Sequence, residues 1–206
     1  MRHFAIRAVL AFLIGILSAT ALAIDDPIAN RPEFQVDDTF IYLNNGRTQH
    51  QRLESRDGGQ LTFDIDGMTA VFTLDLNRVG AWKNDKQVVR WKPHNHMLVF
   101  PLSVGSVWDE TYTTHSQKDG AYERSKACEV LAYGPKKVRA GSFNSFHIRC
   151  DNQRIGRDRP ARENYWYAPD VGRPGTGRII HYNAPALGLE WELAEVRLAP
   201  TTVSAR

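Results

Sequence analysis

The chain has 206 residues, a formal net charge of +3 at pH 7 and 42% hydrophobic residues. A chain of this length can bury a hydrophobic core in one domain. The nearly balanced charge offers little electrostatic attraction for nucleic acid or for an acidic membrane surface, so we predict neither as a partner.

The first 23 residues have the pattern of a secretory signal peptide. Arg2 and Arg7 precede an apolar run over residues 8–21, and Ala21-Leu22-Ala23 supplies the small residues that a cleavage site requires. An uncleaved membrane anchor is the alternative, but the run is shorter than the ~20 apolar residues of a bilayer-spanning helix. We therefore predict cleavage before residue 24 and a bacterial protein that is periplasmic or secreted.

Cleavage would leave residues 24–206. The removed segment carries two arginines and no acidic residue, so its loss lowers the formal charge from +3 to +1. No cysteine directly follows the apolar run, so we expect no lipid attachment at the new N-terminus. No later stretch is long and apolar enough to span a membrane, and we predict no transmembrane segment after cleavage.

The two cysteines, Cys128 and Cys150, both lie in the predicted mature chain. An oxidising compartment favours joining them, and a hairpin centred near Arg139 would place them opposite each other. A redox or metal role is the alternative, but the chain has no Cys-x-x-Cys pair. We predict a structural disulfide.

The mature sequence consists of short β-rich runs separated by turn residues, with almost no helical periodicity. Leu61, Phe63 and Ile65, for example, alternate with polar residues, which is typical of a strand with one buried face. The predicted strands cover residues 39–43, 47–55, 61–66, 69–76, 87–91, 108–114, 122–133, 146–150, 164–168, 179–182 and 189–193.

These runs predict an all-β fold, an antiparallel meander that forms a half-barrel or a two-layer sandwich with few or no helices. A lead over residues 24–37 precedes a single domain over residues 38–200. Weak internal similarity divides that domain into two halves, about 38–97 and 98–200. Residues 201–206 are predicted to be a flexible tail.

Two breaks are predicted in the second half. Gly134-Pro135 should end a strand, because proline donates no hydrogen bond to a ladder. Residues 151–163 are polar and charged and should form a long exposed hairpin loop. This loop carries Arg154, Arg157, Arg159 and Arg162. The four side chains are either solvated or form an anion-binding loop, since clustered guanidinium groups suit phosphate or carboxylate.

No residue set for catalysis emerges from the sequence. It contains no Gly-x-Ser-x-Gly elbow, no phosphate loop and no dinucleotide fingerprint, and we predict no cofactor. His94 and His96 would share one face of a strand, which makes them weak candidates for a metal site, but no third ligand is evident. A metal-dependent hydrolase is therefore the least favoured function.

Aromatic residues are the better indication of a binding site. Stacked aromatic rings bind sugar faces or apolar ligands, and five tryptophans are many for this length. The predicted ligand-binding candidates are Trp91, Trp108, Tyr165, Trp166 and Tyr167. The alternative is a structural sheet in which Trp166 faces inward and the two neighbouring tyrosines face outward.

Three segments resemble a group of bacterial exported β-rich domains of unknown function. They are residues 101–108 (Pro-Leu-x-x-Gly-x-x-Trp), 140–143 (Ala-Gly-x-Phe) and 165–172 (Tyr-Trp-Tyr-Ala-Pro-x-Val-Gly). The resemblance covers about residues 98–182, and residues 173–177 depart from it because the strand of the group resumes directly after the last glycine. Domains of this type look similar to the half-barrels of envelope lipoprotein carriers, which implies a groove for an apolar ligand.

Export, one disulfide and surplus aromatic residues together predict a non-enzymatic periplasmic or secreted domain. It would bind an envelope component, an apolar ligand or a glycan, on a concave sheet face. The alternative is an accessory or assembly protein that docks another envelope protein through a strand edge or the arginine loop. Candidate partners are thus an envelope lipid, a glycan or a protein, and the oligomeric state does not follow from the sequence.

Overall fold

The computed structural model of the protein describes residues 27–157 and 159–200. The predicted signal peptide (1–23) and the predicted tail (201–206) lie outside these residues. Nothing helical within them has the length and apolar character that crossing a membrane requires.

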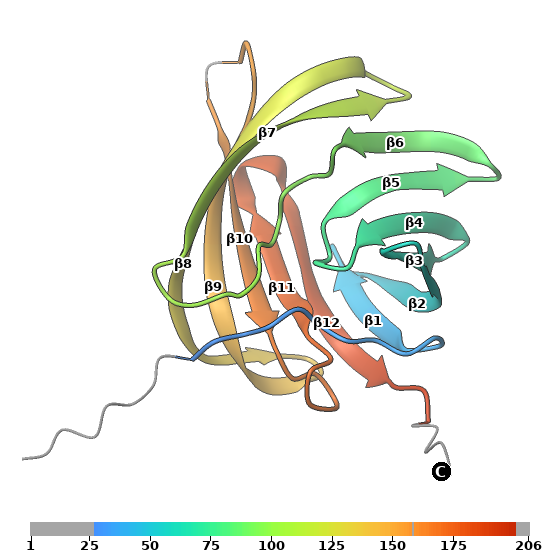
Figure 1. Ribbon diagram of the computed structural model, residues 1–206, viewed down its shortest axis with the longest axis vertical. Helices are drawn as coiled ribbons and strands as arrows, with labels where there is room; N and C mark the ends of the chain where they lie inside the picture. Colours follow the sequence, from blue (N-terminus) through green and yellow to red (C-terminus); the bar gives the residue numbers. More distant parts are fainter. Residues whose placement is uncertain (1–26, 158, 201–206) are drawn as a thin grey trace, which may run out of the picture.

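Twelve antiparallel strands close into a barrel (Figure 1). The described residues contain one 3₁₀ helix, η1 (Pro185–Leu187), and no α-helix. The predicted all-β, antiparallel class is confirmed. The strands are β1 (Thr39–Asn44), β2 (Arg47–Asp57), β3 (Gln60–Ile65), β4 (Met68–Thr73), β5 (Arg78–Lys83), β6 (Lys86–Lys92), β7 (Val107–Ser116), β8 (Gly120–Val138), β9 (Gly141–Arg154), β10 (Ala161–Ala168), β11 (Arg178–Ala184) and β12 (Leu189–Arg197).

Closure of the barrel corrects the predicted half-barrel or sandwich. Each strand pairs with the next along the chain, and β12 returns to pair with β1, from Thr39 opposite Arg197 to Asn44 opposite Trp191. Every hairpin has a turn signal in the local sequence, whereas the pairing of the first strand with the last has none. The strands of both predicted halves therefore belong to one sheet.

β8 runs further than predicted, through Gly134-Pro135 to Val138. Pro135 lies opposite Asn144 of β9, whereas β7 pairs with β8 only as far as Glu129. This part of β8 thus has a strand ladder on one side only. Proline is accepted there because an edge position does not require its missing N–H.

The predicted long loop over residues 151–163 is also shorter than expected. β9 continues to Arg154 and β10 begins at Ala161, which leaves residues 155–160 as the connection. Polar composition suggested a loop, but the inner face of a barrel can hold polar residues when they hydrogen-bond to one another.

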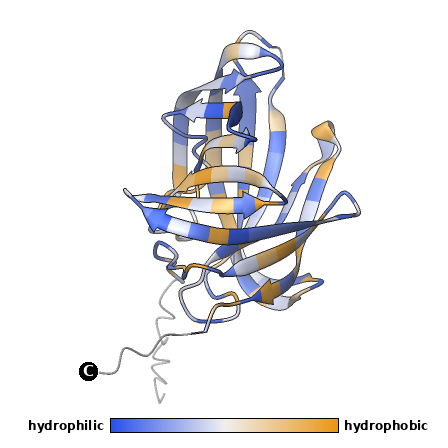
Figure 2. Ribbon diagram, turned by 90° about the vertical axis from the view of Figure 1, so that its right-hand side faces the viewer, coloured by the Kyte–Doolittle hydropathy of each residue, from blue (hydrophilic) through white to orange (hydrophobic). Residues whose placement is uncertain are grey.

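Apolar and polar residues alternate along the strands (Figure 2). Leu61, Phe63 and Ile65 of β3 are buried, as predicted. One end of the barrel is filled by side chains that have almost no exposed surface, among them Phe40, Leu53, Leu98, Leu102 and Tyr167. Close packing of this kind leaves no room for a ligand at that end.

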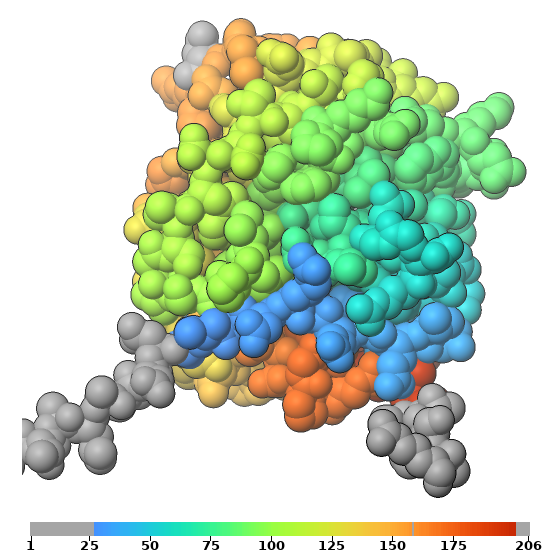
Figure 3. Space-filling model, viewed as in Figure 1, coloured from blue at the N-terminus to red at the C-terminus, as the bar shows by residue number. Residues whose placement is uncertain are grey.

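The N-terminal segment, residues 27–38, crosses the filled end of the barrel. It lies beside the linker over residues 93–106 (Figure 3). Ala29 forms a β-bridge with Leu102 of the linker. Arg173 donates a hydrogen bond of 2.6 Å to the buried carboxylate of Asp38. Phe34 adds its ring to the core. The segment therefore closes one end, and the remaining interior space lies toward the other.

Cys128 of β8 and Cys150 of β9 are joined by a disulfide, as predicted. The two residues lie directly opposite each other in the strand register, with their Cα atoms 4.1 Å apart. Both are buried, so the bond forms part of the inner wall of the barrel. The β8–β9 turn lies at residues 139–140, where the hairpin was predicted.

Candidate functional site

An open cavity of about 400 Å³ occupies the end of the barrel opposite the filled core. Its volume lies within the range of small-molecule sites. Polar side chains in its wall include those of Arg78, Tyr112, Arg124, Lys126, Asn152 and Glu163. Further aromatic side chains in the wall are those of Trp91, Tyr122, Tyr165, Tyr182 and Trp191. The wall thus combines hydrogen-bonding groups with flat apolar surfaces.

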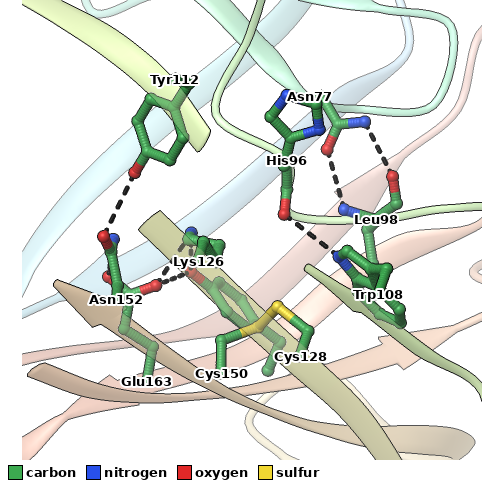
Figure 4. The surroundings of a disulfide bond; sticks show 11 residues. Asn77, His96, Leu98, Trp108, Tyr112, Lys126, Cys128, Cys150, Asn152 and Glu163 are labelled. Atoms are coloured by element: carbon green, nitrogen blue, oxygen red, sulfur yellow. Dashed lines mark hydrogen bonds and ion pairs between the residues drawn. A yellow bond between two sulfur atoms is a disulfide. The ribbon is translucent and has the colours of Figure 1, made fainter. Parts of the chain in front are cut away.

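Lys126 and Glu163 form an ion pair in the wall of this cavity (Figure 4). The Lys126 Nζ lies 2.9 Å from the Glu163 Oε2, and the two side chains are only 2% and 8% exposed. Tyr165 donates a hydrogen bond of 2.5 Å to the same carboxylate oxygen and accepts one of 3.2 Å from Nζ. Alternation along β10 places Glu163 and Tyr165 on the same, inner face.

Asn152 of β9 extends this network toward the open end. Its amide Nδ2 donates to Glu163 Oε1 at 3.0 Å, and its Oδ1 accepts from Tyr112 at 3.3 Å and from Arg124 Nη1 at 3.1 Å. Figure 4 shows Tyr112 of β7 directed at Asn152, across the intervening strand β8. The buried polar groups are satisfied by one another, as buried polar groups must be.

The surroundings determine which of these groups are charged near neutral pH. Burial lowers the pKa of Lys126, although the charge of Glu163 opposes this. Burial favours a higher pKa for Glu163, but Lys126 and the hydrogen bonds from Tyr165, Lys126 and Asn152 outweigh it and hold that pKa below its ordinary value. Burial raises the pKa of Tyr112 to about 12 and that of Tyr165 well above its ordinary value. Both tyrosines therefore act as donors and Glu163 as a carboxylate.

The mouth of the cavity carries exposed apolar side chains. Leu187 of η1 and Leu189 of β12 line the cavity and are 50% and 41% exposed. Trp191 follows on the same face of β12 and stacks on Tyr182 with ring centroids 5.4 Å apart. Exposed leucines at the mouth of a cavity with aromatic rings in its wall are a feature of binding sites for ligands with an apolar part.

A smaller space of about 30 Å³ adjoins the cavity and shares Arg78, Met97 and Trp191 with it. Arg178 of β11 lines this space and is buried. Its Nε donates to the Tyr42 hydroxyl at 3.1 Å and its Nη2 to Gln51 Oε1 at 2.5 Å. A guanidinium group therefore lies in the interior with neutral hydrogen-bond partners.

The predicted aromatic candidates do not gather at one place. Trp91 and Tyr165 line the cavity. Tyr167 is buried in the filled core, and Trp108 donates its indole N–H to the His96 carbonyl at 3.3 Å. Trp166 lies on the outer face, because Tyr165 and Tyr167 on either side of it point inward. The alternative with Trp166 inward and the tyrosines outward is therefore wrong.

The predicted anion-binding loop does not form as one cluster. Arg154 belongs to β9, and its guanidinium lies 4.0 Å from the centroid of the Tyr122 ring. Arg162 belongs to β10 and pairs with Asp151 at 3.2 Å. Of the four arginines, Arg157 and Arg159 alone lie in the connection between the strands. The four residues are thus divided between two strands and a loop.

His94 and His96 lie in the linker that follows β6, with ring centroids 4.1 Å apart. Burial lowers the pKa of both imidazoles. Within residues 27–157 and 159–200, no group of three or more His, Cys, Asp or Glu side chains is arranged to hold a metal ion. The pair has no third ligand in this part of the chain.

The polar residues of the cavity were not among the sequence-based candidates, although one local signal could have identified Lys126. In β8, Tyr122, Arg124, Lys126, Cys128 and Val130 occupy alternate positions and so share one face. A cysteine predicted to be buried in a disulfide places that whole face inside. Arg78, Asn152 and Glu163 have no comparable signal, because they come from other strands.

Comparison with known proteins identifies similar folds but no family. No protein-family model matches the sequence, and no curated protein does. The hypothetical lipoprotein YmcC of Escherichia coli K12 superposes with a TM-score of 0.53 at 10% identity, over 83% of this chain and 92% of that one. At this identity the likeness concerns the fold alone.

Two further structures align over 82% of this chain and 99% of theirs, each with a TM-score of 0.46. They are a proposed lipoprotein of Parabacteroides distasonis, at 9% identity, and a proposed exported protein of Bacteroides fragilis described as having a YmcC-like fold, at 15% identity. The resemblance noted in residues 98–182 stays a prediction.

Proposed function

We propose that this protein is an exported, non-enzymatic β-barrel of the bacterial cell envelope that binds an envelope component in its interior cavity. The observation that carries the proposal is the cavity of about 400 Å³, open at one end of a barrel whose other end is filled. The predicted signal peptide supports export. YmcC, which shares the fold, is described as a lipoprotein, which is compatible with an envelope location.

The residues of the cavity wall and the free volume between them support ligand binding over a purely structural role. A barrel interior that served stability alone would be filled by side chains, as it is around Phe40 and Leu53. Here the interior instead holds a satisfied polar network and partly exposed tryptophans around free volume. Such walls bind ligands that have both a polar part and an apolar part.

Docking of another envelope protein is the second hypothesis, and two of its supports are weaker than the sequence indicated. Closure by β1 and β12 pairs two strands that would be edges in a half-barrel. The arginines expected to form one docking loop are separated, with Arg154 over Tyr122 and Arg162 paired with Asp151. Ligand binding in the cavity is therefore the function that we favour.

The proposal is tested by filling the cavity with a side chain. Thr113 and Thr114 are neighbours on β7, but only Thr114 lines the cavity. We expect the wild-type protein to bind either the uncharged fluorescent probe N-phenyl-1-naphthylamine or members of a lipid and glycan panel in native mass spectrometry. Thr114→Trp should abolish this binding, and the matched control Thr113→Trp should retain it.

Near-ultraviolet circular dichroism of each variant shows whether the barrel remains folded. If Thr114→Trp does not fold, Val89→Trp fills the same cavity from β6. Wild-type protein that binds no compound, or binding that survives both cavity-filling variants unchanged, would overturn the proposal.

A further inference from the structure

The cavity wall carries more positive than negative charge. Lys126 is neutralised by Glu163, with which it forms an ion pair of 2.9 Å. Among the described residues that line the cavity, Glu163 is the only carboxylate, whereas Arg78 and Arg124 add two further positive charges. Within residues 27–157 and 159–200, neither arginine forms an ion pair. The described wall therefore has two uncompensated positive charges.

Arg78 is held by its backbone, and its side chain remains available. Its N–H donates to Asn95 Oδ1 at 2.7 Å, and its carbonyl accepts from the Asn95 N–H at 3.0 Å. Arg78 lines both the main cavity and the adjoining smaller space. No hydrogen bond from its guanidinium is formed within the described part of the chain. All five of its N–H donors are therefore free for a ligand.

Arg124 uses only part of its hydrogen-bonding capacity. Its Nη1 donates to Asn152 Oδ1 at 3.1 Å, and this contact orients the side chain along the cavity wall. Asn152 is itself fixed by Tyr112 and Glu163. The guanidinium is thus positioned by a neutral acceptor and retains donors on its other nitrogens.

Arg178 adds positive potential from the adjoining space. Its guanidinium carbon lies 4.5 Å from the centroid of the Phe40 ring and 4.8 Å from that of Phe63. Its hydrogen-bond partners, Tyr42 and Gln51, are neutral. Burying cationic groups without counter-charges costs free energy, unless a bound anion supplies the opposite charge.

We propose that the cavity takes a ligand with a negatively charged carboxylate, phosphate or sulfate group, which pairs with Arg78 and Arg124. This inference rests on the proposed binding function and specifies its ligand class. The planar fork of a guanidinium group matches the oxygen atoms of such groups with two parallel hydrogen bonds. The uncharged remainder of the ligand lies against Trp91 and Trp191 and reaches the exposed leucines at the mouth.

The test uses two fluorescent probes that differ in charge. One is 8-anilinonaphthalene-1-sulfonate, and the other is N-phenyl-1-naphthylamine, which has the same ring system without the sulfonate. We expect the anionic probe to bind at least about tenfold more tightly, because a hydrogen-bonded charge pair in a desolvated site contributes that much. Its affinity should also fall with increasing salt.

Variants of the two arginines locate the effect. Arg78→Gln and Arg124→Gln should each weaken binding of the anionic probe about tenfold and leave the uncharged probe nearly unchanged. Arg78→Lys keeps the charge and should retain more affinity than Arg78→Gln. Arg162→Gln, on the outer face beside Asp151, is the control and should change neither probe.

Displacement of the anionic probe identifies the source of the charged group. Dodecyl phosphate below its micelle concentration represents a lipid, and glucose 6-phosphate represents a sugar. Displacement by the first alone indicates a lipid, and displacement by the second alone indicates a sugar; either supports the inference.

The failure of this inference differs from that of the proposed function. If neither probe nor any compound of the panel binds, the binding function itself is wrong. If Thr114→Trp blocks binding but folded Arg78→Gln and Arg124→Gln bind the anionic probe as the wild type does, the cavity binds ligands and the anionic class is wrong. Equal affinity of the two probes at low salt also overturns the inference.

Discussion

Lys126 and Glu163 pair across an intervening strand. Lys126 of β8 lies opposite Asn152 of β9, and Glu163 of β10 lies opposite Cys150 of β9, so the 2.9 Å contact between their charged groups spans β9 diagonally on its inner face. Asn152 and Tyr165 hydrogen-bond to the same carboxylate. The pair thus joins three strands of the barrel at the wall of the cavity.

Removal of one member of this pair should strongly destabilise the protein. Lys126→Met leaves the Glu163 carboxylate buried without its counter-charge, and we expect a loss of about 3–5 kcal/mol in the free energy of unfolding. The double variant Lys126→Met with Glu163→Gln should lose less, because no isolated charge remains. Urea denaturation followed by tryptophan fluorescence measures both.

Arg162→Gln, which breaks an exposed ion pair, is the control and should cost at most about 1 kcal/mol. Equal losses for the single and double variants would contradict this account.

The disulfide should contribute substantially to stability. Cys128 and Cys150 are 22 residues apart, and closing a loop of that length in the unfolded chain is worth ~3 kcal/mol in the chain-entropy model. We therefore expect the double variant Cys128→Ser with Cys150→Ser to unfold at a lower urea concentration than the oxidised wild type. Wild-type protein treated with a reductant should shift in the same direction. A midpoint that reduction leaves unchanged would show that the loop closure contributes little.

Acidification below neutral pH should weaken the fold through two buried histidines, His96 and His181, and the half-buried His94. Burial lowers the pKa of His94, His96 and His181 below the ordinary value of 6.5. The unfolded chain then binds protons that the folded chain does not, so the free energy of unfolding falls as the pH decreases from 6.5 through the folded-state pKa values. Asp75 and Glu110 oppose the shift at His94, and Lys126 adds to it at His96.

His96→Asn should make this dependence on pH less steep. His96 has a φ of 46°, and asparagine tolerates this left-handed conformation better than most residues. Urea denaturation at a series of pH values between 7.5 and 5 gives the slope for each protein. His115→Asn on β7 serves as the control. A slope for His96→Asn equal to that of the wild type would show that His96 does not contribute.

Gly177 is required by close packing against Tyr167. A Cβ atom at residue 177 would overlap the phenol oxygen of Tyr167, which is buried in the filled core. We expect Gly177→Ala to lower the free energy of unfolding by about 1–3 kcal/mol. Gly134→Ala is the matched control, because its Cβ would meet no atom within 4 Å, and it should be nearly neutral.

Removal of the tyrosine hydroxyl should partly rescue the Gly177→Ala variant. The Tyr167 hydroxyl is buried without a hydrogen-bond partner in the described structure, so Tyr167→Phe alone should cost little. The double variant should be more stable than Gly177→Ala, as thermal unfolding would show. If the double variant is no more stable than Gly177→Ala, the protein relieves the overlap by a movement that does not depend on the Tyr167 hydroxyl.

Features that depend on neighbouring residues could be predicted from the sequence. The hairpins around Asn45-Gly46 and Lys118-Asp119 follow from turn chemistry, and the buried face of β3 follows from alternation. The disulfide was predicted from a hairpin centred near Arg139, but its register also depends on a β-bulge between Val130 and Ala132, which shifts the pairing by one residue so that Cys128 faces Cys150. These features form locally, because a turn and its two flanking strands contain all the residues that determine them.

Alternation along a strand defines two faces but does not say which face is buried. For this reason Tyr165 and Tyr167 were candidates for either side, and only the packed barrel places them inside and Trp166 outside. The same applies to Glu163, which looks like part of a polar loop until β9 and β8 bring Asn152 and Lys126 to it.

The sequence by itself determined an all-β chain of consecutive hairpins with one disulfide, because turn residues and the period of two act over a few residues. The tertiary structure alone decided that β1 and β12 close the barrel and that one end is filled while the other keeps a cavity. It also decided that Arg78, Arg124 and Lys126 meet there. These outcomes depend on pairing and packing between strands far apart in the chain, for which no local pattern exists.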